Sequence, residues 1–288
     1  MKTAIITDSN SGINEVTGRE LGIFVIPMPV IIDGKIYYEG VNISQSAFYD
    51  SLTSGKNVST SQPSPGDVIC AWEDVFKKGY DEIVYIPMSS GLSSSCHSAI
   101  GLAEDYDGRV QVVDNHRISV TQRQSVLDAK KLADKGCSST DIKVKLEESA
   151  YESSIYVAVD TLEFLKKGGR VTAAGAAIGT VLNIKPVLTI QGDKLDAFAK
   201  IRGMKKCEKK MLEAIKNDYE TRFAGVEASS ISIGAAGTFD NQKMADEWFN
   251  AVREYFPGAY VFYDPLTFSV GCHVGPNSAG IGICRIIE

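Results

Sequence analysis

The sequence predicts an α/β protein with two domains, an N-terminal parallel-sheet domain with helices on both faces and a C-terminal mixed α+β domain. In the first half, short β-rich runs alternate with helical stretches, which is the pattern of parallel strands joined by helices. In the second half, that alternation gives way to a hairpin, a long charged helix and further strands. The 288 residues are enough for two domains of ordinary size. We place these domains at residues 1–153 and 154–288.

The N-terminal domain is predicted from apolar runs bounded by turn residues. Asp33-Gly34 is a hairpin signal between two of these runs, and Pro65 is well placed to open a helix. Polar residues follow three strands, at Asp8-Ser9, Ser89–Ser95 and Asp114-Asn115, and open parallel sheets bind ligands at this edge. The predicted strands are Ala4–Thr7, Ile23–Ile32, Lys35–Glu39, Glu82–Met88 and Val110–Val113, and the predicted helices are Ser46–Thr53, a helix from Pro65 to Gly79, Ser95–Tyr106, Val120–Lys135 and Asp141–Tyr151.

The C-terminal domain is predicted to begin with the strand Ile155–Val159 and to end with the strand Gly280–Ile287. Small residues crowd the predicted helix Val171–Leu182, which suits close packing against a neighbour. His273 falls in a glycine-rich bend, Gly271–Pro276, beside the last strand. The other predicted elements are the hairpin strands Lys185–Ile190 and Leu195–Lys200, the helices Met204–Phe223 and Gln242–Tyr255, and the strands Ser230–Gly234 and Ala259–Tyr263.

Composition and charge argue against several classes of function. Hydrophobic residues make up 44% and charged residues 23% of the chain, which is the balance of a globular protein. The net charge of -6 argues against nucleic acid, because phosphates are bound by clustered Lys and Arg, and against adsorption to an anionic membrane. The first apolar run reaches Asp8 too soon for a signal peptide, and no apolar stretch has the length of a membrane span. We expect a cytoplasmic protein that contacts a membrane at most transiently.

The cysteines and histidines do not indicate a metal or a cofactor. The six cysteines are spread along the chain without a C-x-x-C pair, and His97, His116 and His273 are the only histidines. Structural zinc sites need such residues at short, regular spacing. We expect reduced, partly buried thiols, no metal and no cofactor apart from a bound ligand.

Two hydroxyl-rich loops are candidates for binding an anion. In the first, Ser64 suits the cap of the following helix, which leaves Thr60 and Ser61 for another role. The second, Ser89–Ser95, joins a strand end to a helix N-terminus, where backbone N–H groups and the helix dipole favour negative charge. Ser93 adds a hydroxyl donor there. Helix capping is the simpler explanation of the first loop, and a polar turn with a serine cap explains the second equally well.

Three further side chains are candidates for contact with a ligand. His273 can hydrogen-bond a ligand or merely a backbone carbonyl. Arg170, which follows Gly168-Gly169, and Arg202 have the donor geometry for a carboxylate or a phosphate. A single arginine is more often a solvated surface group, so these residues alone do not specify a ligand.

Six short motifs stand in order along the chain. They are Thr-Asp-Ser at 7–9, Thr-Ser-Gln-Pro-Ser-Pro at 60–65, Ser-Ser-Gly-Leu-Ser at 89–93, Leu-Lys-Lys-Gly-Gly-Arg at 165–170, Ile-Gly-Thr-Val-Leu-Asn-Ile-Lys-Pro-Val-Leu at 178–188 and His-Val-Gly-Pro from 273. Together they resemble the motifs of the DegV family of bacterial fatty-acid-binding proteins. The resemblance spans nearly the whole chain, and its most specific elements are Thr60–Pro65 and Gly168–Leu188.

The resemblance implies a non-catalytic subunit that binds one long-chain fatty acid. It implies that the carboxylate is held by hydroxyl groups, those of Thr60, Ser61 and Ser93. His273 would lie close by, and Arg170 and Arg202 would face the phosphorylated head group or a kinase surface. Members of the family present the bound acid to a separate ATP-dependent fatty acid kinase, which converts the carboxylate to an acyl phosphate in phospholipid metabolism.

The chain departs from the family pattern in two places. Where the family commonly has Gly-Thr-Tyr after the serine at 93, this chain has Ser94-Ser95-Cys96-His97. Where the family commonly has Ser after the aspartate at 114, this chain has Asn115. These differences bear on the geometry of the head-group site and on the preferred ligand.

A lipid ligand agrees with elementary energetics. Each buried methylene contributes about 0.8 kcal/mol, so about fifteen of them contribute on the order of 12 kcal/mol before the cost of ordering the chain. Hydroxyl donors then suffice to orient the head group, without a buried lysine that would lose its hydration.

Two other functions are open from the sequence. A serine hydrolase acting on lipid esters would need Ser93 within hydrogen-bond reach of His273, with Asp8 or Asp114 to orient the histidine. A binding module for another small carboxylate or a phosphate would use the same helix N-termini but a short polar pocket. The fatty acid hypothesis requires instead an elongated apolar cavity whose mouth carries the hydroxyls of both loops.

Overall fold

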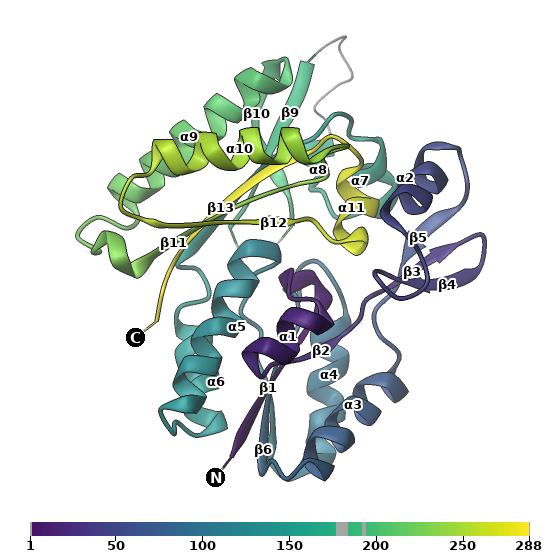
Figure 1. The fold of residues 1–288 in the computed structure, drawn as a ribbon, viewed down its shortest axis with the longest axis vertical. Helices are drawn as coiled ribbons and strands as arrows, with labels where there is room; N and C mark the ends of the chain where they lie inside the picture. Colours follow the sequence, from purple (N-terminus) through teal and green to yellow (C-terminus); the bar gives the residue numbers. More distant parts are fainter. Residues whose placement is uncertain (1, 177–183, 192–193, 288) are drawn as a thin grey trace.

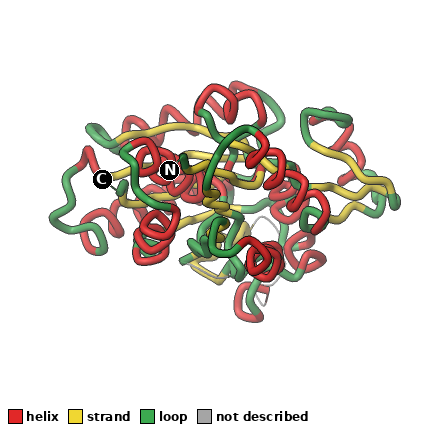
Figure 2. The backbone as a smooth tube through the Cα atoms, turned by 90° about the horizontal axis from the view of Figure 1, so that it is seen from below, coloured by secondary structure: helices red, strands yellow, loops and turns green. Residues whose placement is uncertain are grey.

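The computed structural model describes residues 2–176, 184–191 and 194–287, and in them the chain forms three sheets (Figure 1). A six-stranded sheet and a four-stranded parallel sheet lie one above the other along the long axis. A three-stranded sheet projects from the side of the molecule, and Figure 2 shows the same projection from below. The fold class predicted from the sequence is therefore confirmed.

The four-stranded sheet has the strand order β2-β1-β6-β7, and all of its pairs are parallel. Side chains of β1 alternate between two cores, because Ala4 and Ile6 pack with Trp72 on one face and Ile5 packs with Leu132 on the other. Helices thus cover both faces. The strands are β1 (Thr3–Asp8), β2 (Phe24–Ile26), β6 (Glu82–Ile86) and β7 (Val110–Val112), and the helices are α1 (Glu15–Leu21), α3 (Pro65–Lys77), α4 (Ser95–Ala103), α5 (Ser119–Asp134) and α6 (Ser139–Glu148), with short 3-10 helices at Ser9–Ser11 and Glu104–Tyr106.

The three-stranded sheet and its helix form a unit that we call the arm, residues 29–60. Strand β3 (Pro29–Ile32) pairs antiparallel with β4 (Lys35–Tyr38), as the Asp33-Gly34 turn predicted. It also pairs with β5 (Val58–Thr60), a strand that the sequence analysis missed. Helix α2 (Gln45–Thr53) packs on this sheet.

The prediction of a single strand at Ile23–Ile32 was wrong. Its two ends belong to different sheets, as β2 and β3, with a break at Pro27-Met28. Pro27 has no N–H to donate to a ladder, and the Met28 N–H donates to Ser9 Oγ over 3.0 Å. The chain therefore leaves the parallel sheet at this point and enters the arm.

The six-stranded sheet has the order β10-β9-β8-β13-β11-β12, in which β11 and β12 are parallel and the other described pairs are antiparallel. One face packs against α9 and α10, in a core that includes Met211 and Trp248, and the opposite face is turned toward the N-terminal half (Figure 1). The strands are β8 (Ser153–Ala158), β9 (Ile184–Ile190), β10 (Asp196–Arg202), β11 (Ile231–Gly237), β12 (Tyr260–Pro265) and β13 (Ala279–Arg285), and the helices are α7 (Glu163–Gly168), α8 (Ala173–Ala176), α9 (Met204–Thr221), α10 (Gln242–Tyr255) and α11 (Phe268–Val274), with a 3-10 helix at Ala228–Ser230.

Two predictions in this half need correction or restriction. His273 does not lie in a bend, because the residues before Gly275 form helix α11. A Cβ built on Gly271 of this helix would lie 2.6 Å from the Tyr49 hydroxyl, so the helix packs closely against the arm there. Of the predicted helix Val171–Leu182, the structure describes α8, and residues 177–182 lie outside the described part of the chain. None of the helices in the described ranges has the length and apolar character of a membrane span.

Helix α5 joins the two halves by packing its first turn on the six-stranded sheet. Val120 occupies a depression where two paired residues, Gly234 and Gly282, have no side chains. A Cβ built on Gly234 would lie 2.3 Å from the Val120 Cβ, and one built on Gly282 would lie 2.8 Å from Val120 Cγ2. Both distances are shorter than nonbonded carbon atoms tolerate. One turn later, Arg123 forms an ion pair of 3.0 Å with Asp264 of β12.

The arm also crosses between the halves. The ring of Phe48 stacks on Phe268 of α11 with centroids 4.6 Å apart, and Glu39 accepts the Phe268 N–H over 2.8 Å. Because both contacts join the first half of the chain to the second, the division into domains at residue 153 stays a prediction.

Arg117 holds the segment that links the two halves. Its side chain is buried, and its guanidinium donates to the carbonyls of Ser149 and Ala150 over 2.5 and 3.2 Å and to Ser125 Oγ over 3.0 Å. The two carbonyls lie at the C-terminal end of α6, where a positive charge is favoured. The arginine therefore fixes the chain just before β8.

We predict that Arg117→Met lowers the free energy of unfolding by about 3 kcal/mol or more, because it leaves buried carbonyls without donors. Urea denaturation measures the change. The matched control is Arg253→Met at an exposed position of α10, which should alter stability by less than about 0.5 kcal/mol. A loss at Arg117 no larger than that of the control would contradict the assigned role.

Candidate functional site

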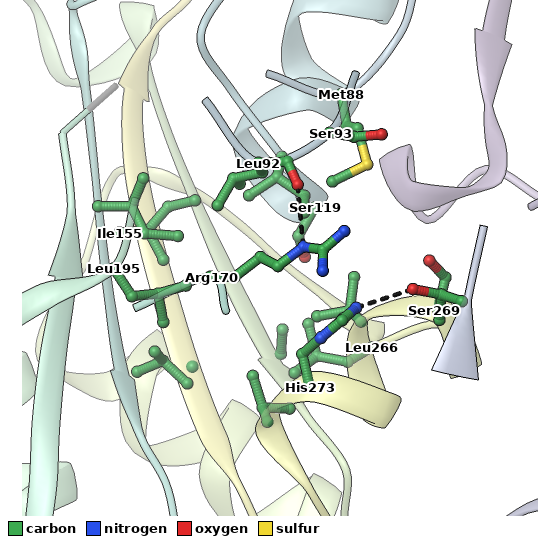
Figure 3. A pocket seen from close by; sticks show the side chains of 18 of the residues that line it. Met88, Leu92, Ser93, Ser119, Ile155, Arg170, Leu195, Leu266, Ser269 and His273 are labelled. Atoms are coloured by element: carbon green, nitrogen blue, oxygen red, sulfur yellow. Dashed lines mark hydrogen bonds between the residues drawn. The ribbon is translucent and has the colours of Figure 1, made fainter. Parts of the chain in front are cut away.

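An apolar cavity lies between the two halves, against the face of the six-stranded sheet that α9 and α10 do not cover. The space free of protein atoms, with the open solvent at its mouth included, is about 850 Å³. Most of its lining residues are apolar and come from both halves, among them Met88, Leu92, Ile155, Leu195 and Leu266 (Figure 3). The cavity is thus suited to an apolar ligand.

Polar side chains gather at one side of this cavity. Figure 3 shows the guanidinium of Arg170 between Ser93 and His273, while the stem of this arginine starts beside Leu195 and Ile155. Thr60, Ser61 and Gln62 also line the cavity, and Ser61 is exposed, so the polar end lies near the surface. The two hydroxyl-rich loops singled out in the sequence therefore meet at one site.

Thr60 and His273 are brought together by the contact between the arm and α11. Thr60 ends β5 and His273 lies on α11, and Thr60 Oγ1 is 2.9 Å from His273 Nε2 although 213 positions separate the two residues. Partial burial of the ring, with the charge of Arg170 as a second cause, lowers the pKa of His273 to about 4. The imidazole is therefore neutral at pH 7.

The neutral ring has a preferred tautomer. His273 Nδ1 is enclosed and has no hydrogen-bond partner among the described residues, and it lies so close to Gly168 that a Cβ built there would be 2.1 Å away. An enclosed N–H without an acceptor is rarer and more costly than an unpaired lone pair, so the proton is favoured on Nε2. His273 then donates to Thr60, whose own hydroxyl proton is left for a ligand.

The serines differ in what their hydroxyl groups already bind. Ser93 Oγ accepts the Ser95 N–H over 3.2 Å, and the hydrogen bonds of the described residues give its proton no acceptor. Ser61 Oγ donates to the Gln62 carbonyl over 3.1 Å. Ser93 can therefore donate to a ligand directly, whereas Ser61 would first have to break its hydrogen bond to the Gln62 carbonyl.

Arg170 reaches the cavity from the turn after α7. Gly169 ends that helix in the left-handed conformation with φ of 68°, which glycine adopts without strain. Arg170 Nε donates to the Leu92 carbonyl over 3.2 Å, and Nη1 donates to the Gly168 carbonyl. Within the described ranges no carboxylate pairs with this guanidinium, so its positive charge is open to an anion.

The structure adds polar residues to the predicted set, Gln62 among them, and separates one residue from it. Ser119 and Ser269 line the cavity, but no sequence motif marks them, and Ser119 is notable only for its φ of 54°, which is uncommon for serine. Arg202 is exposed at the end of β10 and does not line the cavity. The prediction that Arg202 contacts the head group therefore finds no support in this geometry.

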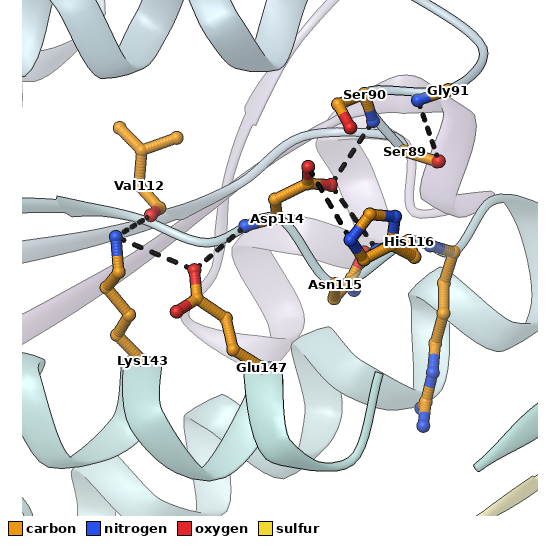
Figure 4. Close-up of polar contacts among 10 residues, drawn as sticks. Ser89, Ser90, Gly91, Val112, Asp114, Asn115, His116, Lys143 and Glu147 are labelled. Carbon is orange, nitrogen blue, oxygen red and sulfur yellow. Dashed lines mark hydrogen bonds and ion pairs between the residues drawn. The ribbon is translucent and has the colours of Figure 1, made fainter. Parts of the chain in front are cut away.

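Asp114, which follows β7, holds the backbone of neighbouring loops in place and does not line the cavity. Asp114 accepts the N–H groups of Ser90 and His116 over 3.2 and 3.4 Å, and its own N–H donates to Glu147 of α6 over 3.3 Å (Figure 4). These contacts tie the loop that carries Ser93 to α6. Asp114 is thus a support for the site.

The carboxylate after β1 has a similar role. Asp8 is buried and accepts the N–H groups of Met88 and Asn10 over 2.8 and 3.0 Å and the amide of Gln122 over 3.2 Å. Burial raises the pKa of Asp8 to about 6, against the effect of these hydrogen bonds. The carboxyl group joins the ends of β1 and β6 to α5.

The residues of a serine hydrolase are not assembled. Among the described residues no hydrogen bond joins Ser93 to His273, whose Nε2 pairs with Thr60, and Asp8 and Asp114 bind other groups. The part of the chain that the structure describes also contains no cluster of three or more His, Cys, Asp or Glu residues able to hold a metal ion.

Comparison with known proteins identifies the family. The model of a family described as "Uncharacterised protein, DegV family" matches residues 2–285. The chain belongs to the DegV family. A DegV domain-containing protein from Caldanaerobacter subterraneus subsp. tengcongensis is 31% identical over 281 residues, which cover 97% of this chain and 98% of the relative.

Solved DegV structures share the fold. A DegV family protein from Thermus thermophilus, described for its fatty acid binding, is 29% identical with a TM-score of 0.86 and covers 99% of this chain and 100% of its own. DegV from Bacillus subtilis, described as a fatty acid binding protein, is 26% identical with a TM-score of 0.85 and covers 99% of both chains. The family resemblance predicted from the sequence is confirmed.

We predict that His273→Gln reduces the pH dependence of stability between about pH 6.5 and pH 4. In this window the unfolded wild-type chain binds a proton at His273 that the folded chain does not, so wild-type stability falls as the pH falls. A pKa lowered from 6.5 to about 4 corresponds to about 3 kcal/mol by pH 4. Urea denaturation of both delipidated proteins at neutral and acidic pH measures the difference.

Buried carboxyl groups with raised pKa values, such as Asp8, act in the opposite direction, but equally in wild type and variant. The difference between the two proteins therefore isolates His273. The same substitution at exposed His97 controls for the loss of an imidazole. Identical pH slopes for wild type and His273→Gln would contradict the prediction.

Proposed function

We propose that this protein binds one long-chain fatty acid, with the tail in the apolar cavity and the carboxylate at its polar end. The observation that carries the proposal is the cavity itself, which is apolar over most of its lining and has hydroxyl donors and a guanidinium at one side. The DegV proteins of Thermus thermophilus and Bacillus subtilis, both described as binding fatty acids, support it. A small carboxylate or a phosphate would leave most of this lining without a partner.

The head group would be held by donors from separate elements. Thr60 and Ser93 would each donate a hydroxyl proton to the carboxylate, and His273 would fix the direction of the Thr60 hydroxyl. Arg170 would attract the negative charge without itself being neutralised by a described carboxylate. Hydrogen bonds to a charged group contribute about 1.5–3 kcal/mol each, less than the tail, so the head group is oriented more than it is anchored.

We also propose that the bound acid is presented to a separate ATP-dependent kinase, which transfers a phosphoryl group to a carboxylate oxygen and releases ADP. The polar end lies near the surface, where a partner could reach it. Arg170 lies beside this end and would stabilise the added charge of the acyl phosphate. The family resemblance, and not a contact seen in this chain, suggests the partner.

We predict that the purified protein carries a fatty acid, which lipid extraction and native mass spectrometry should identify. After delipidation, an added long-chain acid at about 100 times its Kd should stabilise the folded state by about 2.7 kcal/mol. Acetate and inorganic phosphate are the control ligands. No thermal shift with several long-chain acids, or an equal shift with acetate or phosphate, would sink the proposal.

We predict that Ser93→Ala lowers fatty acid affinity by about tenfold, near the lower end of the roughly 1.5–3 kcal/mol given above, because water at this polar end near the surface replaces part of the lost hydrogen bond and the tail contribution is unchanged. Acyl phosphate formation by an added fatty acid kinase should fall much further, since the carboxylate loses an orienting donor. Ser94→Ala is the matched control, because Ser94 is exposed next to Ser93 and its side chain makes no cap hydrogen bond. A large loss of lipid with normal turnover of the acid that is still bound would contradict the role given to Ser93.

A further inference from the structure

The floor of the cavity lacks side chains at one place on the six-stranded sheet. Gly280 of β13 pairs with Val157 of β8 on one side and with Ala236 of β11 on the other. All three residues line the cavity. A Cβ built on Gly280 would meet no atom closer than 3.8 Å, so there is room for a side chain that the sequence does not supply.

The neighbouring row of the sheet shows how such a depression is otherwise used. Gly282 and Gly234 lie two residues further along the same two strands and therefore on the same face. There Val120 of α5 takes the place of the missing side chains, within 2.3–2.8 Å of the built Cβ positions. Over Gly280 and Ala236 the equivalent space belongs to the cavity.

The backbone does not explain the glycine at 280. Its φ is not among the positive values of the described residues, so another residue would fit the strand. Glycine inside a strand is destabilising by roughly 0.5–1 kcal/mol relative to alanine and often marks the close approach of another group. At Gly234 and Gly282 that group is Val120, whereas at Gly280 the described residues place no side chain and the space belongs to the cavity.

We infer that the depression over Gly280 and Ala236, here called the floor depression, selects acyl tails that are wider at that depth than a straight saturated chain. This inference rests on the proposed binding of a fatty acid. A straight tail has the same width along its length and would leave the depression empty, which loses contacts on that side. A tail with a bend or a side group at that depth, from a cis double bond or a methyl branch, would fill it.

The test compares three acids of equal carbon number on delipidated full-length protein: a straight saturated acid, a cis-monounsaturated acid and a methyl-branched acid. The wild type should bind the straight acid more weakly than at least one of the other two. Gly280→Val fills the floor depression and should lower the affinity for the wider acid by about 10- to 200-fold relative to the straight acid. The two wider acids distinguish a bend from a branch.

Two further variants keep the result interpretable. Ala236→Val fills the floor depression from the adjacent strand and should shift the preference in the same direction, so it carries the test if Gly280→Val does not fold. Gly101→Val is the matched control, because Gly101 is exposed on α4 and a Cβ built there meets nothing within 4 Å. It should leave the ratio of affinities unchanged.

The outcomes separate this inference from the proposed function. If the wild type binds the acids but both filling variants lower all affinities equally, or leave the ratio unchanged, the selectivity assigned to the floor depression is wrong and fatty acid binding stands. If the wild type binds none of the three acids, both proposals fail.

Discussion

The distance between the two halves of the molecule is set by the packing of Val120 against two glycines, Gly234 and Gly282. Because Gly234 and Gly282 have no side chains, the first turn of α5 approaches the six-stranded sheet more closely than any larger residue would allow. The residue before Val120, Ser119, lines the cavity, so the contact that joins the halves also closes the cavity on one side. The ion pair of Arg123 with Asp264 crosses the same interface, and its two side chains keep only 18% and 15% of their surface exposed. A wider separation would open the apolar lining to water, at about 25 cal/mol for each Å² exposed.

The chemistry of the cavity divides between its two ends. Burial of an apolar tail is favourable wherever it occurs, so the apolar end of the cavity needs only sufficient volume and the exclusion of water. The polar end needs geometry, and each of its donors comes from a different element: Thr60 from the arm, Ser93 from the loop after β6, Arg170 from the turn after α7 and His273 from α11. Their arrangement therefore depends on the packing of the arm on α11, where Phe48 stacks on Phe268. Because different parts of the cavity serve them, the affinity for the tail and the orientation of the head group can vary independently.

Local sequence signals predicted most helices and strands, whereas the features that were missed depend on contacts between residues far apart in the chain. Alternating strands and helices gave the parallel sheet. The hydroxyl-rich loops were singled out because capping by Ser64 leaves Thr60 and Ser61 for another role, and because Ser89–Ser95 joins a strand end to a helix N-terminus. The break inside Ile23–Ile32 was missed, since the apolar run continues past Pro27 and only the contact with Ser9 shows where the strand ends. Helix α11 was interpreted as a bend because it contains Gly271, which packs closely against the hydroxyl of Tyr49, a residue 222 positions away. No pattern in one sequence distinguishes Gly280, which faces a cavity, from Gly282, which faces a helix.

The two departures from the family pattern do not reach the cavity. Ser95 and Cys96 are buried below the loop, Cys96 in the core between α4 and the parallel sheet, while Ser94 and His97 are exposed. Asn115 is buried too, and its side chain accepts the Arg117 N–H over 3.1 Å. None of these residues lines the cavity, so they change the support of the head-group loop and leave its donors, Thr60 and Ser93, in place. A difference in the preferred ligand would then arise along the tail, where the walls are apolar and shape discriminates, and the floor at Gly280 and Ala236 is a place where this lining leaves room for a wider tail.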